Sequence, residues 1–243
     1  ALEWLDVKKY VGFTAPFIKA YRPTLELDRE ALVLWSHSDT PAPVFHSAGS
    51  CYYAALAGNA TLPLRSRNRW LLRPLSGFEG ADILFRCVLA GAIVVAGGEH
   101  VSSGNLLEDL EITHLTLYPR DIPAFLADVD PHDRPVTHIV LAGMASPADL
   151  DALMKNKRHV TMTLGDPETG YFAVVDRHGG VNPMKFATLR LTAEGGLEVS
   201  GKTLAGSHLV SRHARTQPWA TTSWKGFEPG NGPVIRRCSS GGK

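Results

Sequence analysis

One short stretch of this sequence carries the side chains of a nucleophile and a general base. His46 is followed closely by Ser50 and Cys51. An imidazole beside a hydroxyl or a thiol can take its proton and activate it for attack on a carbonyl carbon. On a helix, His46 and Ser50 would share one face, and Ser47 would suit the N-cap position. The stretch is therefore either a catalytic cluster of His46, Ser50 and Cys51 or the start of a helix.

The segment before this cluster has the layout of a phosphate-binding loop but lacks its residue types. The apolar run Ala31–Trp35 predicts a strand, and residues 50–56 predict a helix. A strand, a loop and a helix in this order can hold a phosphate at the helix N-terminus. Residues 36–47 contain neither glycine nor lysine, and Pro41 and Pro43 have no N–H to donate. The sequence favours a solvent-exposed connector.

Alternating apolar runs and helical patterns form the frame for these residues. Residues 68–97 predict a strand, a loop, a helix and a second strand, which is the pattern of a right-handed βαβ unit. Further strands are predicted downstream, with helical patterns between them. The predicted strands are Trp70–Leu72, Ile93–Ala96, Ile112–Leu117, His138–Ala142 and Val160–Leu164. Such alternation predicts a mostly parallel α/β sheet.

The pattern changes near Gly179. Short alternating strands separated by glycines follow, which favours a small antiparallel lobe. The expected organisation is a helical lead-in over 1–28, an α/β core over 29–178, a small β-rich lobe over 179–235 and a flexible tail over 236–243.

Composition narrows the class of protein. The chain has 243 residues, 44% of them hydrophobic, and a net charge of +1, so nothing favours nucleic acid or an anionic membrane surface as a partner. No apolar run approaches the ~18 residues of a membrane-spanning helix, and the N-terminus has no signal-peptide layout. The three cysteines favour a reduced, cytoplasmic protein.

Several segments, in order, resemble motifs of the adenylate-forming acyl- and aryl-CoA synthetases, especially the o-succinylbenzoate–CoA ligases. NRWLLRPLSGFEGADILFRCVLAGAIVVAGG (68–98) is similar to a strand–helix–strand segment of that family, and THLTLYPRDIPAFL (113–126) is similar to its next strand and helix. HIVLAGMASPADLDALM (138–154) and TLGDPETG (163–170) resemble the two motifs that follow in the family. The resemblance extends over roughly residues 29–243.

The resemblance implies a fold and a location for a site. It implies the N-terminal domain of these synthetases: a mostly parallel sheet flanked by helices, with a small C-terminal β-rich lobe and no lid domain. Its substrate cleft would lie at the carboxyl ends of the strands. The positions implied for binding an acyl or aryl group are Gly77, Phe78, Tyr118, Arg120, Gly143, Met144, Gly165 and Glu168.

The sequence departs from the family pattern where ATP chemistry is carried out. The phosphate loop corresponds to Ser36–Pro43, which is shortened and has no glycine or lysine. The family's gating histidine falls at Gly77, and the adenine-stacking aromatic residue falls at Leu164. Glu168 remains, but one carboxylate does not hold a metal ion by itself. We therefore expect neither ATP-dependent adenylation by this chain alone nor a metal site.

Three functions remain open. The chain binds or processes an acyl or aryl thioester without ATP; it is a non-catalytic scaffold that binds a partner protein; or it is half of a ligase completed by a separate lid-bearing chain. The residues specify no cofactor with certainty, and a coenzyme A or phosphopantetheine thioester is the candidate ligand. The expected partners are an acyl-carrier protein or a partner enzyme, in a homo- or hetero-oligomer, with no nucleic acid and no membrane.

Overall fold

The computed structural model describes residues 26–35, 42–73, 78–97, 104–128, 136–154, 158–177, 179–191, 197–205 and 220–222. The expected lead-in and tail, Gly77 and the segment 36–41 lie outside these residues. The helices are α2 (Ala48–Thr61), α3 (Phe78–Ala90), α4 (Gly104–Asp109), η2 (Pro119–Asp121), α5 (Ile122–Asp128) and α6 (Pro147–Met154). The strands are β1 (Glu30–Trp35), β2 (Pro43–Ser47), β3 (Arg69–Leu72), β4 (Ile93–Ala96), β5 (His114–Leu117), β6 (His138–Ala142), β7 (His159–Asp166), β8 (Gly170–Val175), β9 (Val181–Pro183), β10 (Ala187–Leu191), β11 (Leu197–Gly201) and β12 (Ala220–Thr222).

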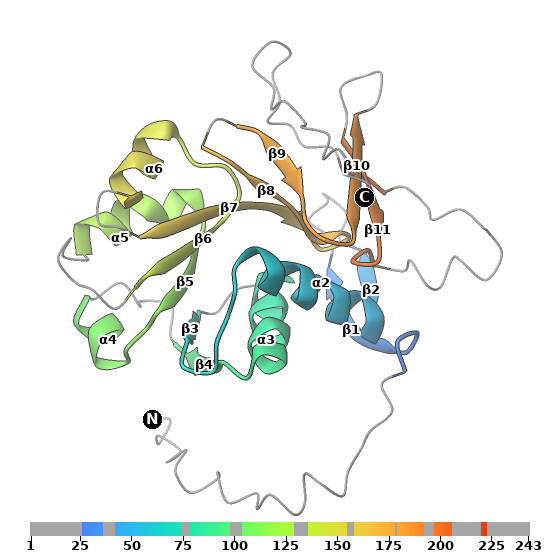
Figure 1. Ribbon diagram of the computed structural model, residues 1–243, viewed down its shortest axis with the longest axis horizontal. Helices are drawn as coiled ribbons and strands as arrows, with labels where there is room; N and C mark the ends of the chain where they lie inside the picture. The colour runs from blue at the N-terminus through green and yellow to red at the C-terminus, as the bar shows by residue number, and fades with distance from the viewer. Residues whose placement is uncertain are drawn as a thin grey trace, which may run out of the picture.

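A seven-stranded mixed sheet forms the centre of the molecule (Figure 1). Its order is β4-β3-β5-β6-β7-β8-β9, and the strands from β4 to β7 are parallel. β8 and β9 are antiparallel to their neighbours. The predicted fold class, a mostly parallel sheet flanked by helices, is therefore confirmed.

Helices pack on both faces of this sheet because its strands alternate two sets of buried side chains. Leu71, Leu115 and Ile139 face a core that includes Phe125 of α5 and Leu153 of α6. On the other face, the core under α2 and α3 contains Leu62, Trp70, Ile83, Cys87 and Val140. None of the described helices is long and apolar enough to cross a membrane.

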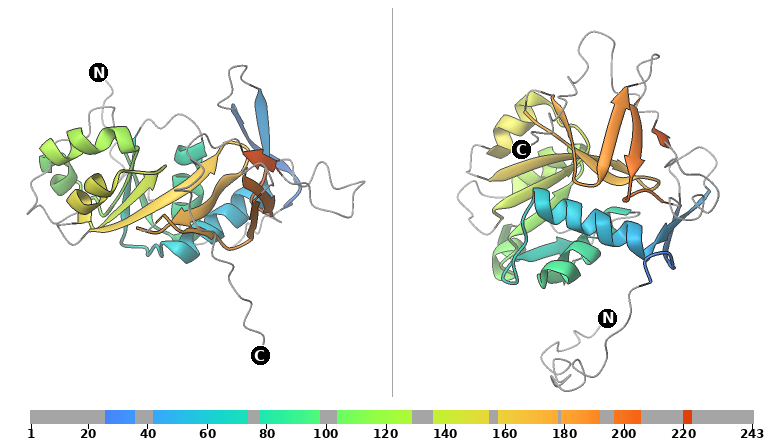
Figure 2. Two further views of the ribbon diagram at one scale, coloured as in Figure 1. Left: turned by 90° about the horizontal axis from the view of Figure 1, so that it is seen from above. Right: turned by 45° about the vertical axis from the view of Figure 1, so that its right-hand side comes forward.

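The segment expected to be a solvent-exposed connector forms a strand where it is described. Residues 43–47 are β2, which pairs antiparallel with β1 in a separate two-stranded hairpin (Figure 2). Val44 and His46 alternate with Phe45, so one side of the hairpin is buried and the other exposed. His46 therefore lies on a strand, and α2 begins at Ala48. Ser47 is the N-cap, as predicted, and its Oγ accepts the Ser50 N–H at 3.0 Å.

The change of pattern near Gly179 falls inside the main sheet. β9 pairs with β8, so the seven-stranded sheet continues past that residue. The strand β8 was not assigned from the sequence. β10, β11 and β12 then form a separate antiparallel sheet of three strands.

Three histidines form a row across the sheet. His114, His138 and His159 are in register at the first positions of β5, β6 and β7. The His114 and His138 rings stack with centroids 4.6 Å apart, and those of His138 and His159 stack at 5.0 Å. The Trp70 ring continues the row, 5.4 Å from His114. This histidine row lies at the amino ends of the strands, opposite the edge where the implied site residues lie.

Candidate functional site

The implied binding residues gather at the carboxyl edge of the sheet. Tyr118 follows β5, Gly143 follows β6, and Glu168 lies in the turn after β7. Phe78 opens α3, which follows β3 after residues that include Gly77. Because β3, β5, β6 and β7 are parallel, these segments leave the sheet at the same edge.

The backbone at this edge is shaped by glycine at two of the implied positions. Gly143 has a φ of +119°, a backbone conformation that residues other than glycine rarely adopt. Its N–H donates to the Thr163 carbonyl at 3.0 Å, which fixes the loop to β7. A Cβ on Gly165 would lie 2.5 Å from the Gly170 carbonyl oxygen, so only glycine allows β7 and β8 to approach here.

The side chains of the other implied residues differ in their surroundings. The Arg120 side chain is 80% exposed, and its guanidinium lies 4.8 Å from the centre of the Tyr118 ring. Burial raises the pKa of Tyr118 to about 12, and the nearby charge of Glu79 adds to this. Met144 is exposed, and Glu168 is half-buried, with its carbonyl accepting the Ala205 N–H at 2.8 Å.

His46 and Ser50 do lie together, and both are buried. His46 Nδ1 lies 3.2 Å from Ser50 Oγ, and His46 Nε2 lies 2.5 Å from the Pro167 carbonyl oxygen. Nε2 must therefore carry the proton and donate it, which leaves Nδ1 able to accept from Ser50. Ser50 Oγ is also placed to donate to the Ser47 carbonyl at 2.9 Å, and its one proton serves only one acceptor.

His46 has the tautomer that a general base needs, but a substrate has no access to Ser50. Ser50 is 0% exposed, so no carbonyl group can reach its Oγ in this conformation. Burial lowers the pKa of His46, which keeps the imidazole neutral. The contacts of His46 with Ser50 and Pro167 join β2 to α2 and to the turn between β7 and β8.

The environment of Cys51 favours the thiol over the thiolate. Its side chain is buried, and burial raises its pKa to about 11. Since the thiolate is the nucleophilic form, the environment of Cys51 suppresses its reactivity. The three residues of the cluster are adjacent, but neither the serine nor the cysteine has the surroundings of an activated nucleophile.

A pocket lies next to these residues, between the β1–β2 hairpin, α2, α3 and the start of β8. The pocket is partly open to solvent. Most of the lining is apolar, with His46, Asp82 and Thr203 as polar contributors. Thr203 is fully buried, and its Oγ1 has no hydrogen-bond partner among the residues that the structure describes. The apolar lining consists of Leu32, Leu34, Ala54, Phe78, Ala81 and Phe85.

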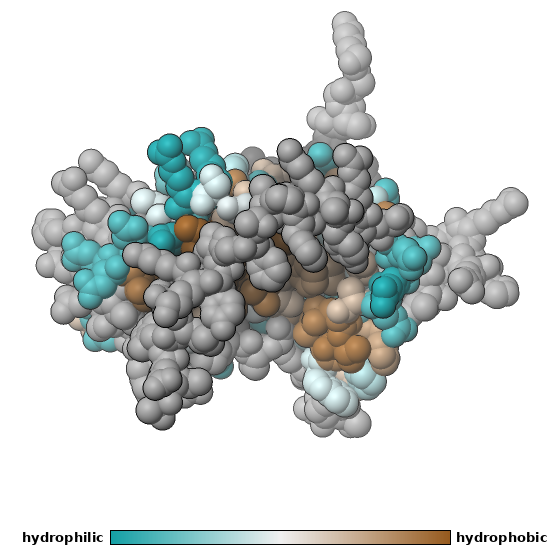
Figure 3. All heavy atoms as spheres, turned by 90° about the horizontal axis from the view of Figure 1, so that it is seen from below, coloured by the Kyte–Doolittle hydropathy of each residue, from teal (hydrophilic) through white to brown (hydrophobic). Residues whose placement is uncertain are grey.

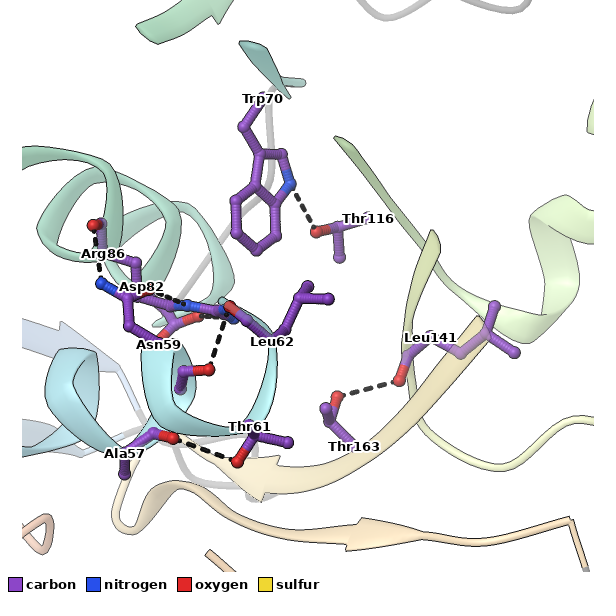
Figure 4. A network of polar contacts seen from close by, with 11 residues as sticks. Ala57, Asn59, Thr61, Leu62, Trp70, Asp82, Arg86, Thr116, Leu141 and Thr163 are labelled. Atoms are coloured by element: carbon purple, nitrogen blue, oxygen red, sulfur yellow. Dashed lines mark hydrogen bonds and ion pairs between the residues drawn. The ribbon is translucent and has the colours of Figure 1, made fainter. Parts of the chain in front are cut away.

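Asp82 connects this pocket to a buried polar network (Figure 4). Its carboxylate lies 3.5 Å from Arg86 Nη1, one helical turn further along α3. Burial raises the pKa of Asp82 to about 6, although the Arg86 charge opposes this. Burial therefore favours the protonated form of Asp82 at the wall of the pocket more than water would.

Arg86 holds the rest of this network together. Its Nη2 donates to the carbonyls of Gly58 and Leu62, both at 3.2 Å, and its Nε donates to Asn59 Oδ1 at 3.2 Å. The guanidinium also lies 4.6 Å from the centre of the Trp70 ring. Arg86 thus satisfies carbonyls at the C-terminal end of α2 from inside the protein.

Sequence reasoning did not identify the pocket residues Asp82, Tyr171 and Thr203. The spacing of Asp82 and Arg86 is an i,i+4 pair, a signal available in the sequence. Thr203 carries no such signal, because it reaches the pocket through long-range folding. Within the described residues, no group of three or more His, Cys, Asp or Glu side chains could hold a metal ion.

No family model matches this sequence, and no curated protein matches it. Solved structures do match its fold. The o-succinylbenzoate CoA synthetase (MenE) of Bacillus subtilis, bound with its product analogue OSB-NCoA, has a TM-score of 0.71 and 17% identity; the match covers 90% of this chain and 53% of that one. MenE of E. coli with an analogue of OSB-AMS has a TM-score of 0.68 and 18% identity over 84% of this chain and 47% of that one. VinN has a TM-score of 0.70 and 16% identity over 84% of this chain and 59% of that one.

These matches confirm the resemblance to adenylate-forming synthetases at the level of the fold. The sheet and its helices match an acyl-CoA synthetase N-terminal domain. The chain spans about half the length of the MenE structures. At this level of identity the likeness concerns the fold alone, and the chemistry must be argued from the residues of this chain.

Proposed function

We propose that this protein binds an acyl or aryl thioester, carried by coenzyme A or by a carrier protein, and does so without adenylating the acid. The observation that supports this is the pocket between the hairpin, α2 and α3. Its apolar walls suit an acyl or aryl group, and Asp82 and Thr203 offer polar contacts.

The residue types in the phosphate-loop region support the second half of the proposal. Adenylation needs preorganised donors for the phosphates, and losing one such donor typically costs ~10²–10³ in rate. Residues 36–43 contain no glycine or lysine. A thioester is already an activated acyl group, so binding it requires none of these donors.

Calorimetric titration tests the proposal with the intact protein. A series of acyl- and aryl-CoA thioesters should bind with Kd values of about 1–100 μM, whereas ATP with Mg²⁺ should not bind. Ala81→Leu fills the pocket and should weaken thioester binding at least tenfold. The matched control is Val88→Leu on the same helix. The Val88 side chain is 78% exposed, so this substitution should leave thioester binding unchanged. Micromolar binding of ATP without any thioester binding would overturn the proposal.

A scaffold role is the second candidate, and one surface favours it. Val33, Trp35 and Phe45 are 49%, 62% and 39% exposed on the outer side of the β1–β2 hairpin. Figure 3 shows apolar side chains gathered on the surface of the molecule seen from below. Such a group on a projecting hairpin is typical of an interaction surface. Sedimentation of the protein alone and with a carrier protein tests it, and Trp35→Ser should abolish any complex that uses this surface.

The third candidate is a ligase half completed by a separate lid-bearing chain. It is suggested by the likeness of the fold to the N-terminal domain of an acyl-CoA synthetase. Pyrophosphate release on mixing with a lid-bearing partner, an acid and ATP would support it. Absence of release with every such partner would reject it.

A further inference from the structure

The main sheet ends on one side in β4, a strand whose outer edge pairs with none of the described strands (Figure 1). β4 pairs with β3 in a regular parallel register, and the N–H groups of Ile93 and Gly97 donate to carbonyls on the β3 side at 2.9 Å. Because successive residues of a strand direct their N–H and C=O groups to opposite sides, those of Val94 and Ala96 point away from β3. The outer edge therefore offers backbone donors and acceptors to a further strand.

This edge lacks the features by which proteins usually protect an open strand. An exposed edge normally has a charged residue, a proline or a bulge that keeps other chains from pairing with it. Residues 91–97 read GAIVVAG and contain neither a charged residue nor a proline. The register of β4 with β3 is also free of irregularity, and both Ile93 and Ala96 are exposed. An apolar edge of this kind is a template for another strand.

The helix beside β4 adds an apolar surface on the same side of the molecule. α3 packs on β3 and β4, and Arg86 joins it to α2, which lies towards β8. With 3.6 residues per turn, Leu84 and Val88 lie about 160° round the helix from Arg86, on the side that faces away from α2. Their side chains are 44% and 78% exposed. Since β4 and β8 lie towards opposite ends of the sheet, this side of α3 points to the open edge.

The open edge of β4, together with Leu84 and Val88, forms what we call the β4–α3 surface, and its residues carry no charge. From Ile83 to Ala96 the only charged residue in the sequence is Arg86, which is 2% exposed and donates to carbonyls of α2. A strongly charged partner would find no counter-charge on these residues. A second copy of the same neutral surface meets no repulsion, and an open strand edge is complementary to itself when the two strands run antiparallel.

We propose that the β4–α3 surface is the interface of a homodimer, in which the β4 strands of two copies pair antiparallel. A two-fold axis at Val95, perpendicular to the sheet, places Val94 of one copy opposite Ala96 of the other. Residues paired in this way exchange both of their backbone hydrogen bonds, so the outward groups of both residues gain partners. The same axis keeps the two α3 helices on one face of the joined sheet and buries Leu84 and Val88 between them.

The dimer leaves the apolar pocket of each copy open. Ala81, Asp82 and Phe85 of α3 line the pocket, whereas Leu84 and Val88 do not. Association through the β4–α3 surface should therefore be equally strong with and without a thioester, so its test is independent of the proposed function.

Sedimentation equilibrium of the intact protein between about 1 and 100 μM tests the association. We expect a monomer–dimer equilibrium in this range. Val88→Lys sets like charges against each other across the axis and should weaken dimerisation at least tenfold. Met154→Lys introduces the same charge at a 43% exposed residue of α6; it is the matched control and should leave dimerisation unchanged. A monomer at every concentration would overturn the proposal.

Amide hydrogen exchange, resolved by residue, locates the interface. The Val94 and Ala96 N–H groups point outward, so they should exchange at least tenfold more slowly in the dimer than in the monomer. The Val95 N–H, which points to β3, should be protected in both states. Equal exchange of Val94 and Ala96 in the two states would show that the copies associate elsewhere and would overturn the proposal.

A proline in β4 tests the strand pairing directly. Ala96→Pro removes an outward N–H without costing a hydrogen bond to β3, and it should weaken dimerisation at least tenfold. The urea midpoint of the monomeric variant shows whether its fold is intact, and Val88→Lys provides the same test from the exposed side of α3. A dimer that Trp35→Ser dissociates, but Ala96→Pro and Val88→Lys do not, would assign the interface to the β1–β2 hairpin and overturn the proposal.

Discussion

Arg86 is a charged residue that is only 2% exposed, and its burial is possible because the residue opposite it is a glycine. Gly58 leaves the space in which the guanidinium lies, since a Cβ there would be 2.7 Å from Arg86 Nε. The position of Arg86 in turn satisfies carbonyls of α2 and places a positive charge beside Asp82. Such a buried charge is costly as soon as one of its partners is lost.

Gly58→Ala should therefore destabilise the protein strongly. The added methyl displaces Arg86 and leaves carbonyls of α2 without a donor, at an expected cost of about 2–4 kcal/mol in the free energy of unfolding. Urea denaturation measures this. Ala60→Ser, at an exposed position of the same helix, is the control and should cost less than about 1 kcal/mol. An equal loss in both variants would contradict the role of Gly58.

Cys51 and Cys87 should resist alkylation in the folded protein. Burial raises the pKa of each thiol to about 11, so the thiolate is scarce at neutral pH. We expect iodoacetamide to modify both at least tenfold more slowly in buffer than in urea, with peptide mass spectrometry identifying each site. Rapid modification of Cys51 in the native protein would restore it as a nucleophile.

The strands that the sequence predicted best are short continuous apolar runs of a parallel sheet. Ile93–Ala96 and His138–Ala142 were predicted with the bounds that β4 and β6 have, although β4 is an exposed edge strand and β6 is buried in the middle of the sheet. β2 was missed for the opposite reason. Its one buried side is formed by Val44 and His46, and Pro43 and Ser47 at its ends are typical of loops.

Long-range contacts also limited what could be predicted about the site. The gathering of Tyr118, Gly143 and Glu168 at one edge follows from strand order and could be predicted. The burial of Ser50 depends on Pro167 and on the hairpin, which no local pattern reveals. Thr203 enters the pocket from the far end of the chain for the same reason.

The histidine row should make stability depend on pH. Burial, and then the neighbouring His138 and Arg86, lower the pKa of His114 to about 3 from 6.5. His114 therefore binds a proton more readily in the unfolded chain than in the folded protein. The free energy of unfolding is highest above pH 6.5 and falls by about 1.4 kcal/mol per pH unit as the pH drops toward 3. Asp82, whose pKa is raised to about 6 from 3.8, acts oppositely: its contribution is complete below pH 3.8 and is lost above pH 6.

The substitution His114→Phe separates the effect of His114 on the pH dependence of stability from that of Asp82. Urea midpoints from pH 8 to pH 4 should fall less steeply for this variant than for the wild type, while His159→Phe, at the exposed end of the row, should keep most of the slope. Identical slopes in the wild type and His114→Phe would show that the histidine row does not govern the response to acid.

Among the described residues, two backbone hydrogen bonds tie the segments beside the small sheet to the main sheet and its turns. Met184 N–H donates to Phe172 of β8, and Ala205 N–H donates to Glu168 in the turn after β7. The small sheet can therefore loosen while the main sheet stays intact. This division matters for function, because Thr203 lines the pocket from the segment that follows β11.

Gly201→Ala should separate the stabilities of the two sheets. The methyl group would clash with the Phe186 carbonyl, and Gly201 has a φ of +152° that alanine adopts poorly. We expect amide hydrogen exchange in β10 and β11 to accelerate at least tenfold while β5 and β6 keep their protection. Gly179→Ala, where nothing lies within 4 Å of the added Cβ, is the control for strain alone and should leave β10 and β11 protected. Uniform acceleration in both sheets would contradict this division.

The contact between His46 and Pro167 also has a consequence during synthesis. The two residues are 121 positions apart. At ribosomal rates of ~5–20 residues per second, His46 leaves the ribosome about 6–24 s before its partner is made. During that interval the β1–β2 hairpin has neither this anchor nor the β7–β8 turn beside it, and Leu34 and Val44, which are buried in the folded protein, are exposed. The nascent chain should therefore depend on chaperones that bind apolar segments until residue 167 and the strand after it have emerged.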